Sequence, residues 1–256
     1  WDDHLFISSE SFTEPTSLYY ADENKDFVKI KSLKEKFDPK KYQVEQLYAT
    51  SADGTQIPYF QVSNTSMEKN SSNPTLLYGY GGFQIPLTPS YLGSFARQWL
   101  DNGGVYVIAN IRGGGEFGPK WHQAALKQNR QRAYDDFIAV GETLIANGIT
   151  SSQHLGIRGG SNGGLLVGAV VTQRPDLFNA VICAVPLLDM YRYDKLLAGA
   201  SWVDEYGDPD NPDEWSYISK YSPYQNVFAE GEYPEIYFYT STKDDRVHPG
   251  HARKMA

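Results

Sequence analysis

The sequence predicts an α/β protein whose mainly parallel β-sheet carries helices on both faces. Its length of 256 residues suits one such domain with a small appendage. Short apolar segments of the kind buried in parallel sheets recur along the chain, for example at 75–78 and 105–109. Helical segments alternate with them, and the segment 132–147 places its apolar side chains on one face at helical spacing.

The expected elements begin with a hairpin and continue with alternating strands and helices. The hairpin pairs 42–50 with 56–62 across the turn Ala52-Asp53-Gly54. The later strands are 75–78, 105–109, 154–158, 180–185 and 235–239. The expected helices are 91–102, which ends at Gly103-Gly104, 132–147, which ends at Asn147-Gly148, and 165–172.

The first 38 residues differ from the rest of the chain. They contain two short strand-like segments, around 5–7 and 17–20, followed by a polar turn at 21–25. Because two strands do not form a stable sheet alone, we expect them to be the end of a separate all-β unit. The sequence therefore predicts a division into 1–38, with its linker, and 39–256.

Both ends of the sequence lead us to expect a fragment of a longer protein. Trp1 is preceded by neither an initiator methionine nor a signal peptide. Ala256 lies within a segment, 248–256, that is typical of the beginning of a helix and contains no stop signal.

Composition excludes several classes of function. The formal net charge of −8 argues against nucleic acids and anionic membrane surfaces as partners, because both favour a basic face on the protein. No apolar segment approaches the roughly 18 residues of a membrane span. The single cysteine, Cys183, excludes an intramolecular disulfide and is expected to be a core residue. We expect a cytoplasmic protein, with a periplasmic or secreted one as the alternative, and neither a metal nor a cofactor.

The most specific motif is the glycine-rich segment 159–164, which contains G-x-S-x-G around Ser161. It lies between an expected strand and an expected helix, as in the nucleophile elbow of α/β-hydrolases. That turn strains and exposes the serine and places it at a helix N-terminus, where backbone N–H groups stabilise an oxyanion. Ser161 is therefore the candidate nucleophile. The alternative is a glycine-rich turn that binds phosphate or nothing.

Two further loops follow expected strands and suit the same chemistry. In 78–83, glycines permit the close approach of donors, and a tyrosine hydroxyl can serve as an oxyanion donor; the alternative is a turn whose aromatic side chains pack in the core. Asp244 follows the strand 235–239 and fits the chain order serine, acid, histidine. Its carboxylate would orient a histidine and stabilise the imidazolium.

The catalytic base is the difficulty, because none of the histidines fits the expected position. They are His4, His122, His154, His248 and His251. The first three precede Ser161, whereas the base normally follows the acid on a loop after a further helix and strand. His248 and His251 follow Asp244 by only 4 and 7 residues, which leaves no room for a further helix and strand. His251 as a makeshift base is the alternative, but we expect the triad histidine to lie outside this chain.

Five motifs in this order resemble the prolyl oligopeptidase family of serine peptidases. They are 78–83, 110–116, 159–164, 173–178 and 244–247. The resemblance covers the chain from about residue 40 to its end. It implies an α/β-hydrolase domain joined to a β-propeller, of which residues 1–38 would be the remnant of the last blade, and cleavage of short peptides after proline.

The resemblance also implies a role for each site residue. Ser161 is the nucleophile, Tyr80 and the backbone N–H of Asn162 form the oxyanion hole, Asp244 is the triad aspartate, and Arg246 binds a substrate carbonyl. The proline ring would lie among Phe83, Trp202, Tyr206 and Val247, with Leu187 at an aliphatic position nearby. An aromatic box suits proline, which is a compact apolar ring without an N–H.

Three functions follow from these predictions. The first is a serine endopeptidase that cleaves short proline-containing peptides and works with the propeller domain of the same full-length protein. The second is an esterase or acylaminoacyl-peptidase-like hydrolase. The third is a fragment that binds ligands without chemistry. Because the triad histidine is missing, we expect this chain alone to be nearly inactive.

Overall fold

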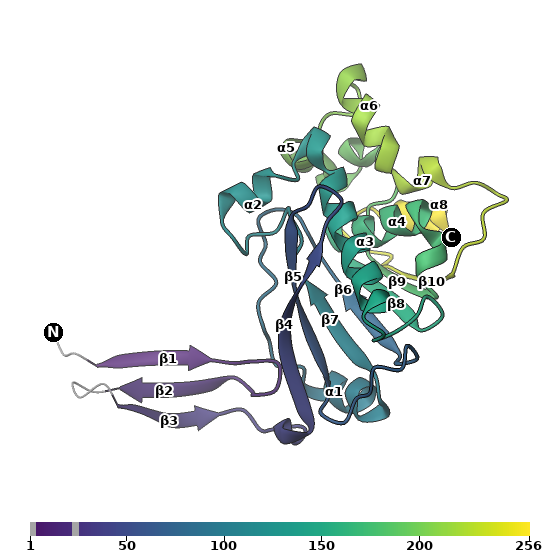
Figure 1. Ribbon diagram of the computed structural model, residues 1–256. Coiled ribbons are helices and arrows are strands. Elements are labelled where there is room, and N and C mark those ends of the chain that lie inside the picture. The colour runs from purple at the N-terminus through teal and green to yellow at the C-terminus, as the bar shows by residue number, and fades with distance from the viewer. Residues whose placement is uncertain (1–3, 22–25) are drawn as a thin grey trace.

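The computed structural model describes residues 4–21 and 26–256 and contains two β-sheets (Figure 1). The smaller sheet is antiparallel, in the order β1-β2-β3, and extends beside the main body (Figure 1). Its strands are β1 (Leu5–Ser9), β2 (Ser17–Ala21) and β3 (Phe27–Ser32). Every side chain of β1 and β3 is exposed, so this sheet forms little core of its own.

The larger sheet has seven strands in the order β10-β9-β8-β6-β7-β5-β4. The first five of these are parallel, and β5 and β4 form an antiparallel hairpin at one edge. The bounds are β4 (Tyr42–Thr50), β5 (Gln56–Asn64), β6 (Thr75–Tyr78), β7 (Val105–Ala109), β8 (Leu155–Gly160), β9 (Ala180–Ala184) and β10 (Glu235–Tyr239).

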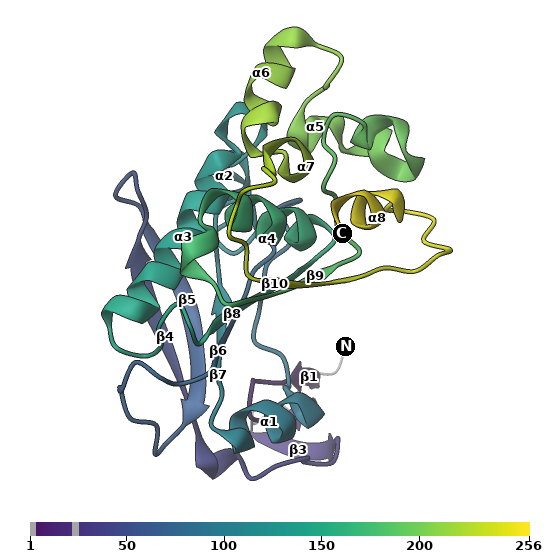
Figure 2. The same ribbon diagram turned by 90° about the vertical axis from the view of Figure 1, so that its right-hand side faces the viewer.

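Helices cover both faces of this sheet (Figure 2). α3 (Gln131–Ala146) and α4 (Asn162–Gln173) pack on one face, in a core that includes Leu77. α1 (Gly93–Trp99) packs on the opposite face, in a core that includes Leu76. Leu76 and Leu77 belong to different cores because successive side chains of a strand point to opposite faces.

The chain between β9 and β10 consists of short helices near the carboxyl ends of the parallel strands (Figure 2). They are η5 (Tyr193–Lys195), η6 (Leu197–Trp202), α5 (Val203–Tyr206), α6 (Pro212–Tyr221) and α7 (Pro223–Asn226). The remaining elements are η1 (Pro39–Lys41), η2 (Leu100–Asn102), α2 (Pro119–Gln123), η3 (Lys127–Asn129), η4 (Pro175–Leu177) and α8 (Gly250–Met255). None of the helices in the described part of the chain has the length and apolar character needed to cross a bilayer.

The structure confirms the predicted fold class. Strands β6, β7 and β10 have the predicted bounds, and the expected hairpin, α1, α3 and the helix at the end of the chain are present. Several elements differ from the expectations: β8 ends at Gly160 rather than at 158, and the helices between β9 and β10 were not predicted. β3 was not predicted, and α4 begins at Asn162 rather than at 165, because its first turn is made of glycines that carry no helical pattern. A polar turn was expected at 21–25. Residues 22–25 lie outside the described residues, so this prediction is not tested. The division of the chain at residue 38 stays a prediction.

Candidate active site

The site lies where the strand order of the large sheet reverses. β6 lies between β7 and β8, so the chain turns in opposite directions at the carboxyl ends of β6 and β8. Ligands of open α/β sheets bind at such a point, because the two following loops separate there. The loop after β6 contains Tyr80, and the turn after β8 contains Ser161.

Ser161 occupies a strained turn between β8 and α4. Its φ and ψ are 58° and −119°, a conformation that non-glycine residues rarely adopt. A Cβ on Gly159 would lie 1.9 Å from the carbonyl oxygen of Gly163, so only glycine fits there. Ser161 is also the N-cap of α4, and the backbone N–H of Asn162, the first helical residue, has no partner within the helix. The geometry is therefore that of the predicted nucleophile elbow.

The Tyr80 side chain approaches this turn from the loop after β6. Burial raises the pKa of its phenol, while a hydrogen bond with the Ser161 side chain and the positive charges of Arg246 and Arg130 act in the opposite direction. The net rise keeps the phenol protonated at neutral pH. Tyr80 can therefore donate a hydrogen bond to an oxygen held beside Ser161, together with the N–H of Asn162.

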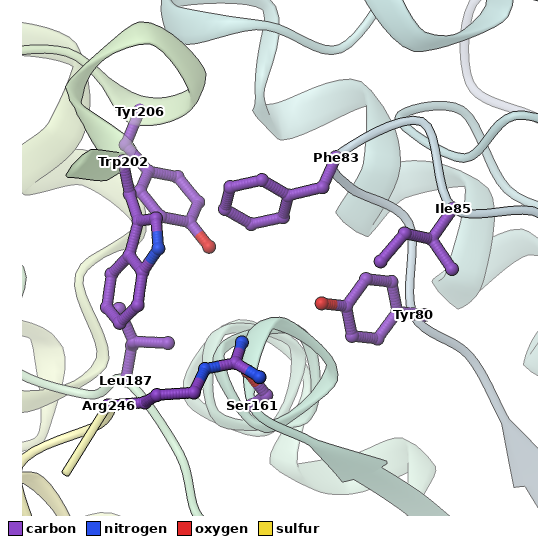
Figure 3. Close-up of a pocket in the computed structure, with 8 residues that line it drawn as sticks. All are labelled: Tyr80, Phe83, Ile85, Ser161, Leu187, Trp202, Tyr206 and Arg246. Atoms are coloured by element: carbon purple, nitrogen blue, oxygen red, sulfur yellow. The ribbon is translucent and has the colours of Figure 1, made fainter. Parts of the chain in front are cut away.

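A cavity of about 160 Å³ opens beside Ser161 (Figure 3). It is smaller than the roughly 300 Å³ at which pockets for drug-sized ligands begin, and thus suits a single small side chain. Its lining residues are Tyr80, Phe83, Ile85, Ser161, Leu187, Trp202, Tyr206 and Arg246. The structure thus brings together seven of the predicted site residues, and Ile85 is one that the sequence reasoning missed.

Aromatic rings form much of the wall of this cavity (Figure 3). The rings of Phe83 and Tyr206 meet edge to face, with centroids 5.7 Å apart. Trp202 ends η6 and Tyr206 ends α5, so the two lie on consecutive short helices rather than on one. Val247 is buried and packs in the main core, but it does not line the cavity. Its predicted place in the pocket is therefore not supported by the lining.

Asp244 lies in the loop after β10, at the same edge of the sheet as Ser161. Its Oδ1 accepts hydrogen bonds from the backbone N–H groups of Arg246 (3.0 Å) and Val247 (2.9 Å). These bonds fix the carboxylate and place Arg246 at the cavity. In the described residues Oδ2 has no hydrogen-bond partner, so it is available to orient an imidazole.

None of the five histidines lines the cavity within the described part of the chain. Nε2 of His122 lies 2.7 Å from Glu205. His251 is buried, and its Nδ1 accepts hydrogen bonds from the backbone N–H groups of Leu188 and Asp189. Because Nδ1 accepts, the neutral ring carries its proton on Nε2, and His251 does not line the cavity, so it offers no free nitrogen to Ser161. The remaining histidines form hydrogen bonds elsewhere. Nδ1 of His4 pairs with the Tyr20 hydroxyl, Nδ1 of His154 pairs with the Ser151 hydroxyl, and Nδ1 of His248 accepts from the backbone N–H of Gly250.

Backbone strain also marks this edge of the sheet. Besides Ser161, Phe83 (φ 56°) and Val185 (φ 38°) have positive φ angles. A positive φ is most costly for a β-branched residue such as Val185. Val185 nevertheless holds it directly after β9, where its N–H bonds to the carbonyl of Tyr239. Strain of this kind clusters at functional sites.

Comparison with known proteins shows which family the chain resembles. The model of the prolyl oligopeptidase family matches residues 91–256. An uncharacterised peptidase of Sinorhizobium fredii is 57% identical over 99% of this chain. A prolyl endopeptidase of Elizabethkingia miricola is 44% identical over 98% of this chain. The solved structure of a post-proline cleaving enzyme from Rickettsia typhi superposes with a TM-score of 0.94 at 47% identity, over 98% of this chain.

The chain spans only about a third of these relatives: 35% of the Sinorhizobium protein and 36% of each of the other two. The family match covers well over half of the chain, and the parallel sheet with its flanking helices is that of an α/β-hydrolase catalytic domain. The chain belongs to the prolyl oligopeptidase family of serine peptidases.

Proposed function

We propose that this chain is the peptidase part of an enzyme that hydrolyses short peptides on the carboxyl side of proline. The observation that carries the proposal is the small aromatic cavity directly beside Ser161. A proline ring is compact, apolar and without an N–H, so it loses little by leaving water for the space between Phe83 and Trp202. A larger side chain would not fit, and a charged one would lose its solvation there.

The reaction is acyl transfer. Ser161 Oγ attacks the carbonyl carbon of the prolyl residue and forms a tetrahedral intermediate, whose oxyanion accepts hydrogen bonds from the Tyr80 hydroxyl and the N–H of Asn162. The base takes the proton of Ser161 Oγ during the attack and gives it to the leaving amine, which leaves an acyl-enzyme that water then hydrolyses. Arg246 lines the same cavity and suits a second carbonyl of the substrate. Asp244 orients the base through its free oxygen.

The base itself comes from outside the described residues, since none of the histidines is available to Ser161. We propose that the chain acts within a longer protein, referred to below as the full-length protein, which supplies this histidine and a β-propeller domain. One support is that the chain covers only 35% of the length of its Sinorhizobium relative. The other is that apolar side chains of β1 and β3 are exposed, as expected if further strands or blades of a propeller pack against this small sheet.

An esterase or an acylaminoacyl-peptidase-like hydrolase would use the same serine but not the same pocket. Trp202→Ala in the full-length protein separates these functions. We expect cleavage of a proline peptide to fall roughly 10- to 100-fold, because the ring loses one wall, whereas cleavage of a small activated ester changes little. An equal fall for both substrates would favour the esterase.

A binding fragment without chemistry is the remaining alternative. It predicts that a fluorophosphonate probe leaves Ser161 unlabelled in the full-length protein, because labelling requires an activated serine.

A further inference from the structure

A buried polar cluster lies directly behind the cavity. Arg130 and Glu205 are only 1% and 4% exposed, and Arg130 Nη1 donates to Glu205 Oε1 at 2.9 Å. The guanidinium also lies over the Tyr206 ring, 5.2 Å from its centroid. His122 approaches the other carboxylate oxygen of Glu205. The mechanism proposed above uses none of these three side chains.

Glu205 connects the cluster to the cavity wall. The backbone N–H of Phe83 donates to Glu205 Oε1 at 2.9 Å. Phe83 has a positive φ of 56°, which phenylalanine adopts only when its surroundings hold it there. Glu205 also directly precedes Tyr206, whose ring meets that of Phe83. One carboxylate therefore fixes the two rings relative to each other.

Arg130 connects the same cluster to the oxyanion hole. Its Nη2 donates to Asn162 Oδ1 at 2.5 Å, and the Tyr206 hydroxyl donates to the same oxygen at 2.7 Å. This fixes the orientation of the Asn162 amide, whose Nδ2 donates to the backbone carbonyl of Tyr80 at 2.6 Å. The two expected oxyanion donors, the Tyr80 hydroxyl and the Asn162 N–H, are thereby tied together through the Asn162 side chain.

We propose that Arg130 and Glu205 are positioning residues that couple the proline pocket to the oxyanion hole. The pair holds Phe83 and Tyr206 on one side and Asn162 and Tyr80 on the other, so that filling the pocket with a proline ring aligns the scissile carbonyl with its donors. The inference rests on the proposed function and adds to it the residues that set proline selectivity.

Stability alone does not account for such a pair. Burying two charges costs about as much as their attraction returns, and apolar residues of similar volume often stabilise a protein equally well. The Nε of Arg130 has no hydrogen-bond partner among the described residues, which adds to the cost. What apolar residues cannot provide is a set of directed hydrogen bonds to a backbone N–H and to an amide oxygen.

The test replaces the pair in the full-length protein by apolar residues, as Arg130→Met with Glu205→Leu. Peptides that differ only in proline or alanine before the cleaved bond are compared, and active sites are titrated with a fluorophosphonate. We expect kcat/KM for the proline peptide to fall roughly 10- to 100-fold, the effect of a misplacement of about 1 Å. We also expect the proline-to-alanine ratio of kcat/KM, which does not depend on the amount of folded enzyme, to fall severalfold.

Two further variants complete the design. Glu205→Gln keeps an acceptor for Phe83 and Arg130, and we expect it to retain most of the ratio. Asp136→Asn is the matched control, because Asp136 pairs with Arg112 at 2.6 Å, is fully buried and does not line the cavity. It should lower stability and leave the ratio unchanged. If the double variant fails to fold, Arg130→Met alone takes its place, since Glu205 keeps His122 as a partner.

If the parent protein prefers proline and the double variant keeps the full proline-to-alanine ratio, this inference is overturned while the proposed function stands. An equal change of the ratio in Asp136→Asn would also overturn it, because the effect would then be one of general stability. A parent protein without a preference for proline would overturn the proposed function and this inference with it.

Discussion

His251 shows how a single buried side chain supports the site without taking part in the chemistry. Its Nδ1 accepts hydrogen bonds from the N–H groups of Leu188 (3.3 Å) and Asp189 (3.1 Å), which follow Leu187 of the cavity. An imidazole that accepts at Nδ1 must be unprotonated there. Burial lowers the pKa of His251 from 6.5 to about 4, with the negative charge of Asp189 acting in the opposite direction.

This shift predicts a pH dependence of stability. Between pH 6.5 and about 4 the unfolded state binds a proton that the folded state does not, so the free energy of unfolding falls as the pH falls. The loss reaches about 3 kcal/mol. Urea unfolding at pH 7 and pH 4.5 measures it. His251→Gln, which keeps an acceptor, should reduce the difference between the two pH values, whereas His154→Gln at an exposed position should not. Equal differences in both variants would contradict the assignment.

At the scale of elements, the elbow depends on two adjacent glycines in different ways. A Cβ on Gly159 would lie 1.9 Å from the carbonyl oxygen of Gly163, whereas a Cβ on Gly160 would meet Ala184 Cβ at 3.5 Å, an ordinary contact. The clash is with backbone, so β8 and α4 would have to separate.

The two glycines therefore make a matched pair of variants. We expect Gly159→Ala to lower the free energy of unfolding by about 3 kcal/mol, the upper range for overpacking, and Gly160→Ala to change it by less than about 1 kcal/mol. Urea denaturation measures both. A similar effect of the two substitutions would show that the close approach of β8 to α4 is not what fixes the turn.

Many of the strands and helices could be predicted from the sequence. Thr75–Tyr78 and Glu235–Tyr239 have the predicted bounds because each is a short apolar segment between clear turn residues. The helices η5, η6, α5 and α7 have at most six residues, too few to carry a helical period, so they could not be predicted. The ten-residue helix α6 (Pro212–Tyr221) was missed although Asn211 and Pro212 are signals of a helix start.

The residues of the candidate site could also be predicted only in part. Ser161, Asp244 and the aromatic residues lie in local motifs or follow from the family resemblance. Arg130 and Glu205 belong to no motif, and only folding brings them together. Ile85 reaches the cavity through the path of the loop after β6, for which the sequence has no signal.

At the scale of the whole molecule, the chain leaves apolar surface uncovered. Phe6, Val28 and Tyr237 are 62%, 57% and 67% exposed, on β1, β3 and β10. Large exposed apolar patches mark interaction surfaces or promote association. We therefore expect the 256-residue chain alone to self-associate.

The isolated chain should also be nearly inactive. Loss of the histidine base lowers the rate by roughly 10⁶-fold in a peptidase of another fold that uses the same kind of triad. A chromogenic proline peptide incubated with the 256-residue chain should therefore release no more product than with its Ser161→Ala variant. Turnover within about 100-fold of the full-length protein would contradict the account, because Ser161 would then have a base within this chain.

The central claim is that Ser161, its oxyanion donors and the aromatic cavity form one site for a prolyl residue. The most direct measurement is a crystal structure of the full-length protein with a peptide aldehyde that ends in prolinal. The account predicts a covalent bond from Ser161 Oγ to the aldehyde carbon, the hemiacetal oxygen facing Tyr80, and the proline ring between Phe83 and Trp202. A proline ring outside this cavity, or an adduct on another residue, would contradict it.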